Sequence, residues 1–382
     1  MCPDGVLFRP LGDLVDYEQP GKYLVDSAVY SHEHATPVLT AGKTFILGYT
    51  DETIGIYQAS EASPVVIFDD FTTALKWVDF PFKAKSSAMK MLTAKDDDLA
   101  SLRFIYFAMQ TIEYGPQDHA RQWIGTYSRF RIPVPPMEVQ REVVRILDQF
   151  TLLEAALRSD LSARRRQYAF YRDSLLSPFD SSAAMIPMGD IGTFARGRRF
   201  TKDDLVDDGI PSIHYGEIYT RYGVSAETAV SRVRSDLAKR LRYAQQNDVV
   251  IAAVGETVED VGKAVAWLGE EPVAIHDDTF LFRSAANPKY VSYCLQTADF
   301  HAQKNKYVAR AKVKRLSGVS LAKIRIPVPT LDRQERIVEI LDKFDAVVSD
   351  PVLGLPAEIA ARRKQYEYYR NRLMTFQEIP HD

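Results

Sequence analysis

The chain of 382 residues contains one sequence motif twice. Residues 131–150 read RIPVPPMEVQREVVRILDQF, and residues 325–344 read RIPVPTLDRQERIVEILDKF, so more than half of the positions are identical. A second pair follows, in which RRRQYAFYRDSL at 164–175 returns as RRKQYEYYRNRL at 362–373. A repeat of this length indicates an internal duplication, and it predicts two similar structural units in one chain.

The repeated motifs have the pattern of long helices. Each copy opens with Pro-Val-Pro, which cannot lie inside a helix. Apolar residues then recur in the three- and four-residue steps of a coiled-coil seam. No Pro or Gly occurs between residues 137 and 177 of the first copy, which predicts one helix of about 40 residues and about 60 Å. The seam positions of the first copy are Val143, Ile146, Phe150, Leu153 and Leu157.

The second copy differs in the middle of its seam. It contains Pro351, Gly354 and Pro356, each of which interrupts a helix. We therefore expect a helix, a loop and a second helix in this copy.

The repeat divides the chain into four segments. Two globular heads, residues 1–132 and 184–325, alternate with a helical spacer at 133–183 and a second one at 326–382. Both heads mix short strand-like runs with one helical stretch, so an α+β fold is expected. The predicted strand regions are 36–50, 63–73, 248–254 and 271–283, and the predicted head helices are 99–112 and 289–303. Apart from a Pro-x-Gly-Asp echo near residues 10 and 187, the heads have diverged, which suggests two different ligands.

Composition limits the class of protein. Two cysteines cannot form a disulfide framework or a four-cysteine metal site. Neither a secretory signal nor a membrane-spanning run is visible, so a soluble cytoplasmic protein is expected. The net charge of −3 is unevenly distributed, because the first head carries −5 and the second head +4. Only the second head therefore has the electrostatic character of a nucleic-acid binder.

The order head, helix, head, helix, together with the motif QRxxVxILDxF and the helix RRxQYxxYRxxL, resembles the specificity subunit of type I restriction–modification enzymes. The stretch from Gly209 to Tyr219 in the second head, and TPVLTAGKTFILGYT with KSSAMK in the first, are similar to target-recognition domains of that family. The resemblance covers essentially the whole chain.

The resemblance implies a non-catalytic subunit with two α/β target-recognition domains. Each domain would read one half of a split, asymmetric double-stranded DNA site, and two long antiparallel helical regions would set the spacing. Two methyltransferase subunits would dock on these helices and methylate adenine, and restriction subunits would translocate and cleave DNA. This chain would bind no cofactor or metal, because S-adenosylmethionine, ATP and Mg²⁺ would be bound by the partners.

Candidate DNA contacts are the cationic and polar side chains of the heads. A solvated charged surface is the alternative for any single one of them. They are Lys43, Thr44 and Lys85 in the first head, and Arg196, Arg198, Arg199, His214, Tyr215, Arg310, Lys312, Lys314 and Arg315 in the second.

Aromatic and apolar residues at helical spacing are the candidates for packing in the helical spacers or against a partner. Base stacking is the weaker alternative for these tyrosines. The candidates are Phe150, Leu157, Tyr168, Tyr171, Phe344, Tyr366 and Tyr369.

Three motifs resemble parts of catalytic or nucleotide-binding sites, but each of them is incomplete. Residues 41–44 (AGKT) end like a phosphate-binding loop, but Pro37 stands where the first Gly is needed, so a turn is expected. The Asp pairs at 69–70 and 277–278 lack a following Glu-x-Lys and read as turn residues. The pair His214-Tyr215 lacks a nucleophile or metal-ligand spacing nearby.

Two other classes of protein remain open at this point. One is a coiled-coil adaptor that tethers two protein ligands, and the other is an enzyme fused to such a module. No adenine-methyltransferase or complete nucleotide-binding motif is present, which argues against the enzyme. Copurification with nucleic acid and a methyltransferase would exclude the adaptor. A methylation-only system without a nuclease is also open.

Overall fold

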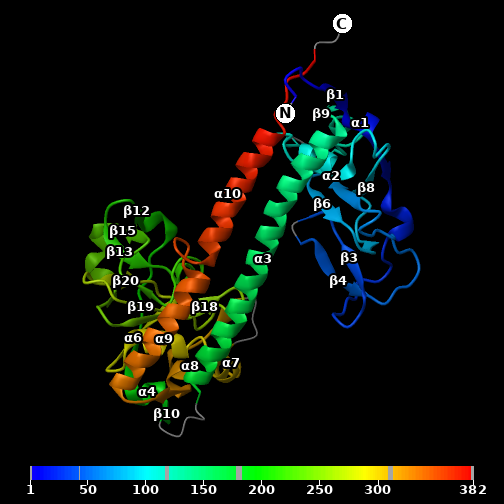
Figure 1. Ribbon diagram of the computed structural model, residues 1–382. Helices are drawn as coiled ribbons and strands as arrows, with labels where there is room; N and C mark the ends of the chain where they lie inside the picture. Colours follow the sequence, from blue (N-terminus) through cyan, green and yellow to red (C-terminus); the bar gives the residue numbers. More distant parts are fainter. Residues whose placement is uncertain (1, 43, 117–119, 178–182, 309–312, 380–382) are drawn as a thin grey trace. The chain divides into compact units, whose positions relative to one another are not determined.

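The structure is a computed structural model that describes residues 2–42, 44–116, 120–177, 183–308 and 313–379 (Figure 1). The chain divides into two compact units. One unit comprises Met1–Ala156 with Ala360–Asp382, and the other comprises Leu157–Ile359. Each unit contains one head and one half of each helical spacer.

The elements of the first head are short and mostly extended. In chain order they are β1 (Leu7–Pro10), α1 (Leu11–Leu14), β2 (Val15–Glu18), η1 (Pro20–Tyr23), β3 (Thr36–Leu39), β4 (Ile46–Thr50), β5 (Val65–Asp69), β6 (Leu75–Val78), β7 (Lys83–Ala84), β8 (Met89–Ala94), α2 (Leu102–Met109), η2 (Tyr127–Arg129) and β9 (Arg131–Val134).

The first head is layered around a four-stranded antiparallel sheet of order β2-β8-β5-β6. Side chains of a strand alternate between the two faces of its sheet. Val66 and Phe68 of β5 accordingly face a cluster that includes α2, whereas Val65 and Ile67 face a second cluster with the sheet β4-β3-β7. The central sheet is therefore buried on both faces.

The second head has more elements in the same general plan. They are β10 (Ala184–Pro187), α4 (Met188–Ile191), β11 (Gly192–Arg196), η3 (Lys202–Asp204), β12 (Leu205–Val206), β13 (Ile210–Ile213), α5 (Tyr215–Thr220), β14 (Ser225–Ala226), β15 (Ser231–Val233), η4 (Ser235–Arg240), β16 (Tyr243–Ala244), β17 (Val249–Ala252), β18 (Val254–Gly255), β19 (Ala264–Trp267), β20 (Val273–Ile275), β21 (Thr279–Ser284), α6 (Pro288–Cys294), α7 (Ala298–Lys304), β22 (Lys314–Arg315), α8 (Gly318–Lys323) and β23 (Arg325–Val328).

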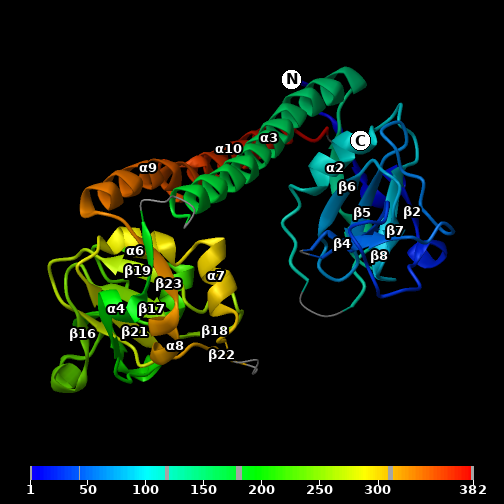
Figure 2. The same ribbon diagram turned by 90° about the horizontal axis from the view of Figure 1, so that it is seen from below.

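Two five-stranded sheets form the second head, β11-β21-β17-β19-β14 and β12-β15-β13-β20-β16. Strand β17 again divides its side chains between two clusters, because Val249 and Ile251 face the helices while Val250 and Ala252 face the other sheet. Figure 2 shows α6 between the strands β17 and β19 and the helix α9 (Leu331–Ser349). Both heads thus share a layered plan despite their sequence divergence.

The spacer helices have the predicted continuity. Helix α3 (Met137–Leu175) is unbroken over 39 residues, and the second copy consists of α9 and α10 (Leu355–Leu373), separated by the turn that contains Pro351 and Gly354 (Figure 1). Phe150 of α3 contacts Tyr369 of α10, whereas Tyr171 near the end of α3 contacts Phe344 of α9. The order of these contacts makes the helical regions antiparallel.

Two sequence predictions need correction. The stretch 289–303 is two helices, α6 and α7, because the hydroxyl of Thr297 accepts a hydrogen bond from Phe300 N at 3.2 Å and caps a new helix. The Pro-Val-Pro stretches lie outside the helices, as predicted, and they contribute to strands, β9 and β23, that pair with β1 and β10 in two-stranded ribbons. A two-stranded ribbon has free edges, where proline is tolerated.

The second correction concerns the seam of α3. Val143 and Leu147 are fully buried, whereas the predicted seam residue Leu153 is 39% exposed. Val143 and Leu147 belong to the core of the first head, so this part of α3 buries its apolar face against the head as well as against α10. Among the described residues, no helix combines the length and apolarity that crossing a bilayer requires.

Candidate nucleic-acid interface

The basic cluster of the second head begins at the end of β11. Arg196 is the last residue of β11, and Arg198 and Arg199 follow in an exposed loop. Gly197 between them is buried, and a Cβ built there would lie 2.0 Å from the carbonyl oxygen of His276. Only glycine allows the loop to pass so close to the β20–β21 turn. The same contact brings the arginines beside that turn.

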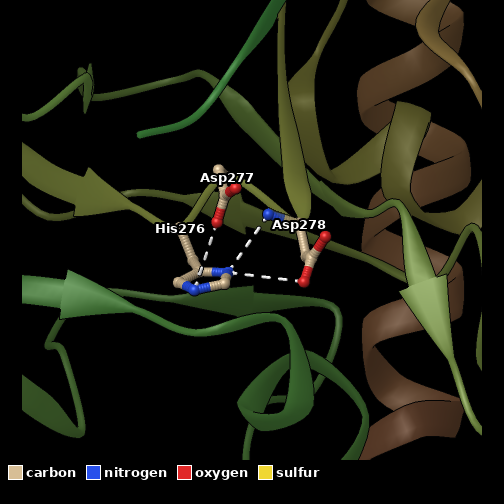
Figure 3. Close-up of side chains that lie close together, drawn as sticks. All are labelled: His276, Asp277 and Asp278. Atoms are coloured by element: carbon tan, nitrogen blue, oxygen red, sulfur yellow. Dashed lines mark hydrogen bonds and ion pairs between the residues drawn. The ribbon is translucent and has the colours of Figure 1, made fainter. Parts of the chain in front are cut away.

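The β20–β21 turn carries His276, Asp277 and Asp278 (Figure 3). Arg196 Nε donates to the Asp277 carbonyl oxygen at 2.6 Å, and its Nη2 lies 3.9 Å from Asp278 Oδ1. Arg315 Nη1 approaches the same Asp278 oxygen at 3.4 Å. Two predicted DNA contacts, 119 positions apart in the sequence, therefore share one carboxylate.

His276 is held in one neutral form by its partners. The Asp278 N–H donates to Nδ1 at 3.1 Å, so Nδ1 carries no proton, and Nε2 lies 3.0 Å from the Phe200 carbonyl, to which it donates. Burial lowers the pKa of this imidazole, which keeps it neutral.

His276, Asp277 and Asp278 also bring potential metal-ligand atoms within 4.8 Å of one another. Both ring nitrogens already bond backbone groups, and the Asp278 carboxylate faces two arginines. These contacts explain why the three residues lie together. They form a structural turn that holds the side chains of Arg196 and Arg315 in place. The sequence reading of Asp277 and Asp278 as turn residues fits this geometry but omits their arginine partners.

His214 and Tyr215 are half-buried beside this turn. His214 precedes α5, and its Nδ1 accepts a hydrogen bond from Gly216 N at 3.2 Å while Glu217 bonds back to its N–H. Its ring centroid lies 4.5 Å from that of His276. Burial is the largest cause that lowers the pKa of His214 to about 4. The structure thus gives His214 a capping and packing role, and its contact with DNA stays a prediction.

Two further predicted residues of the second head, Lys314 and Arg315, form β22. Arg315 is exposed and Lys314 is half-buried, and this strand pairs with β18. Arg310 and Lys312 lie outside the described residues. Arg196 and Arg315 are thus brought together, whereas nothing in the described part of the chain places Arg310 or Lys312.

The candidates of the first head lie at one end of a small sheet. Strand β3 pairs in parallel with β7, and the backbone N–H of Lys85 donates to Leu39 O at 2.9 Å. Thr44 lies in the β3–β4 turn, which also follows Leu39, so Thr44 and Lys85 are neighbours at the same sheet end and both are exposed. Lys43 lies outside the described residues. The described residues of the AGKT stretch, Ala41, Gly42 and Thr44, lie in the turn between β3 and β4, as predicted.

A buried ion pair in the first head was not foreseen. Lys90 and Asp70 are each 1% exposed, and their charged atoms lie 3.2 Å apart. Asp70 also accepts a hydrogen bond from Trp123 N at 2.8 Å, and the Lys90 ammonium lies 4.6 Å from the Tyr17 ring centroid. Asp70 is thus a core residue of the first head.

The repeated motif attaches each head to its helix by the same contacts. Gln140 accepts a hydrogen bond from Ser101 N, and Gln334, its counterpart in the second copy, accepts one from Asn287 N. Ser101 and Asn287 are the N-caps of α2 and α6. Both glutamines also donate to a proline carbonyl of their own Pro-Val-Pro segment.

An aspartate of the same motif adds a second shared contact. Asp148 pairs with Arg103 of α2 at 2.6 Å, and its counterpart Asp342 pairs with Lys289 of α6. The conservation of Gln and Asp between the two copies was visible in the sequence, but their partners in the heads have no common sequence signal.

The predicted packing residues form reciprocal aromatic stacks. Phe150 of the first copy stacks on Tyr369 of the second at 5.5 Å and 24°, and Phe344 stacks on Tyr171 at 5.3 Å and 25°. Phe150 corresponds to Phe344 in the repeat, and Tyr171 corresponds to Tyr369. Each stack therefore pairs the Phe of one copy with the Tyr of the other.

Tyr171 and Tyr369 are 41% and 39% exposed despite their stacking, whereas the other predicted packing residues are buried or half-buried. Tyr366 donates to Gln110 at 2.8 Å, Tyr168 is 7% exposed, and Leu157 is half-buried on α3.

The fold and the candidate surfaces define a class of protein. It is a two-headed scaffold in which antiparallel helices support two related but divergent α/β heads, and one head carries an exposed arginine cluster. No catalytic constellation is required by this arrangement.

The comparisons with known proteins agree with that class. The family model described as the type I restriction modification DNA specificity domain matches residues 182–360. The specificity subunit of the Escherichia coli type I restriction enzyme EcoR124I/EcoR124II is 40% identical over 97% of this chain and 94% of its own length. A putative type I restriction enzyme specificity subunit of Haemophilus influenzae is 29% identical over 72% of each chain.

Solved structures share the fold. The S subunit of a type I restriction–modification system from M. genitalium superposes with a TM-score of 0.55 at 14% identity, over 96% of both chains. A chain from a structural study of complex assembly and conformational transition of a type I system gives 0.59 at 14% identity, over 97% of this chain and 98% of that chain. The chain belongs to the family of type I restriction–modification specificity subunits.

Proposed function

We propose that this chain is the DNA-recognition subunit of a type I restriction–modification complex, in which each head reads one half of a split DNA site. The observation that carries the proposal is the repeated attachment of two unlike heads. Gln140 and Asp148 hold the first head as Gln334 and Asp342 hold the second. Equivalent supports under divergent surfaces are what two-part recognition of an asymmetric site requires.

The chain's own role is readout and positioning. Cationic side chains contact phosphates and set the register, and a few side chains read base edges. Methylation of adenine belongs to two methyltransferase subunits with S-adenosylmethionine, and ATP- and Mg²⁺-dependent translocation and cleavage belong to restriction subunits. These partners and cofactors follow from the family and are part of the proposal.

The spacer helices offer a surface for the methyltransferase subunits. Within one unit, Ile340 and Val347 of α9 are 41% and 44% exposed beside Phe344, and in the other unit Leu152 is 69% exposed. Apolar side chains of this size on a helix surface favour burial against a partner.

The acidic first head fits the same division of labour. Its net charge of −5 opposes tight binding to phosphates. Phosphate contacts from a methyltransferase subunit would compensate, so the isolated chain is expected to bind DNA weakly.

Footprinting of the assembled complex tests the proposal. The complex of this chain with its methyltransferase subunits is expected to protect two short tracts whose sequences are fixed, separated by a spacer of fixed length and free sequence. A single contiguous recognised tract, or equal protection of every sequence, would contradict it.

A further inference from the structure

A pocket of about 360 Å³ opens on the second head where β11, β18, β22 and α8 meet. Its polar wall consists of Arg196, Asp278 and Arg315, and its apolar wall includes Phe280 and Tyr307. All of these residues belong to the same compact unit. A pocket with convergent polar groups and an aromatic wall is the usual form of a specific recognition site.

The two arginines in this pocket are oriented before any ligand binds. Arg196 Nε is committed to the Asp277 carbonyl at 2.6 Å, and the Asp278 carboxylate lies 3.9 Å from Arg196 and 3.4 Å from Arg315. The two arginine side chains are nevertheless 55% and 58% exposed, whereas that of Asp278 is 20% exposed. The carboxylate thus aligns two guanidinium groups whose outer N–H donors remain open to solvent.

An acidic group at this place argues against a simple phosphate contact. A carboxylate beside a phosphate costs binding energy through repulsion, whereas a carboxylate behind an arginine fixes the direction of its N–H fork. Fixed direction matters for reading a base edge. Guanine presents two acceptors, O6 and N7, in the major groove, and an arginine fork is the commonest side chain that recognises them.

We infer that this pocket is a base-reading site of the second head, in which Arg196 and Arg315, aligned by the positioning residue Asp278, recognise a guanine edge in the major groove. The inference rests on the proposed function, and it adds the base, the groove and the residues. Asp278 also disfavours phosphate at the same place, so the pocket contributes sequence discrimination more than affinity.

Selection from a DNA library tests the inference with the assembled methyltransferase complex. The half-site of the second head is randomised, and bound or methylated sequences are counted for the wild type and for Arg196→Lys, Arg315→Lys and Asp278→Asn. The lysine variants keep the charge and lose the planar fork. Arg240→Lys is the matched control, because Arg240 is exposed in η4 of the same head, does not line the pocket and is not among the predicted DNA contacts.

The lysine variants are expected to lose discrimination for guanine at one position of the second half-site by roughly 5- to 150-fold, the range that one bidentate contact supplies. Selection at the half-site of the first head remains unchanged in these variants, and the Arg240→Lys control selects the same sequences as the wild type. Asp278→Asn relaxes the same position and at the same time tightens binding to random DNA, because a negative charge is removed. A merely structural role of Asp278 would weaken both kinds of binding.

Two results would overturn the inference while leaving the proposed function intact. One is an equal loss of affinity for all sequences in the lysine variants, which identifies phosphate contacts. The other is unchanged selection in all three variants. If the wild-type complex selects no split site at all, the proposed function fails and the inference fails with it.

Discussion

At the residue scale, the first head depends on an ion pair that water does not reach. Asp70 directly follows β5 and Lys90 lies in the neighbouring strand β8, and both are almost fully buried. Removing one member of a buried pair leaves an uncompensated charge in a medium of low polarisability, which costs far more than losing a surface pair. The first head is therefore expected to lose much of its stability when either member of this pair is replaced.

Asp70→Ala is expected to lower the free energy of unfolding of the first head by about 3–5 kcal/mol. Hydrogen exchange of the amides in β5 and β8 measures the change. Lys22→Ala serves as the control, because Lys22 is 80% exposed and pairs with Glu18 on the surface, where a loss below about 1 kcal/mol is expected. Equal effects of the two substitutions would show that the buried pair is not needed.

His214 gives the second head a dependence on pH. Its folded pKa of about 4 lies below the ordinary value of 6.5, so the unfolded chain takes up the proton first as the pH falls. The contribution of neutral His214 to the free energy of unfolding is therefore fully present above pH 6.5. It decreases towards pH 4, by up to about 3 kcal/mol at ~1.4 kcal/mol per pKa unit.

His214→Asn separates this effect from other titrations, since asparagine also caps helices. Thermal melting between pH 4.5 and 7 is expected to show a smaller acid-induced loss of Tm for the variant than for the wild type. His301, whose burial also lowers its pKa to about 4, titrates in both proteins. Parallel pH curves for the two proteins would mean that His214 has the same pKa in the folded and the unfolded chain.

At the scale of elements, the two aromatic stacks join the repeated copies reciprocally. Stacked rings contribute about 0.5–1.5 kcal/mol beyond their buried area. A double-mutant cycle on Tyr171 and Phe344 is expected to give a coupling energy in that range, and the cycle on Phe150 and Tyr369 the same value within error. Leu152→Ala, at a 69% exposed position of α3, should couple to neither. Strongly unequal coupling energies in the two cycles would show that the two stacks do not stabilise the protein equally.

The length of the helices offers a second test at this scale. Seven residues of helix-forming sequence inserted after Ala156 in α3, with seven more after Ile359 in α10, keep the heptad pattern and fall where the two compact units meet in the sequence. The added ~10 Å corresponds to about three base pairs. The spacer of the recognised DNA should lengthen by that amount, as measured by selection from a library of spacer lengths. An unchanged spacer length would refute the role of the helices in setting it. A flexible Gly-Ser insert of equal length is the control, and it should broaden the range of spacer lengths that the complex accepts.

Local signals explain which elements were predictable. The unbroken α3 follows from the lack of Gly and Pro, and the separation of α9 from α10 follows from Pro351 and Gly354. The pairing of the Pro-Val-Pro strands with β1 and β10 joins segments more than 100 residues apart, for which no local pattern exists. The candidate site follows the same rule, since the arginine cluster is visible in the sequence but its link through Asp278 to Arg315 is not.

At the scale of the whole molecule, duplication explains both what is shared and what differs between the heads. The residues that the two copies share include those that attach a head to a helix, whereas the heads themselves have diverged in sequence. Under the proposed function, one half of the recognised site can change without the other, because each head has its own core and its own attachment.

The measurement that tests this account most directly is the methylome of cells that carry the chain with its partner subunits. The account predicts methyl-adenine in both halves of one split, asymmetric motif, and the disappearance of the motif when the chain is deleted. A contiguous methylated motif, or a methylation pattern that survives the deletion, would contradict it.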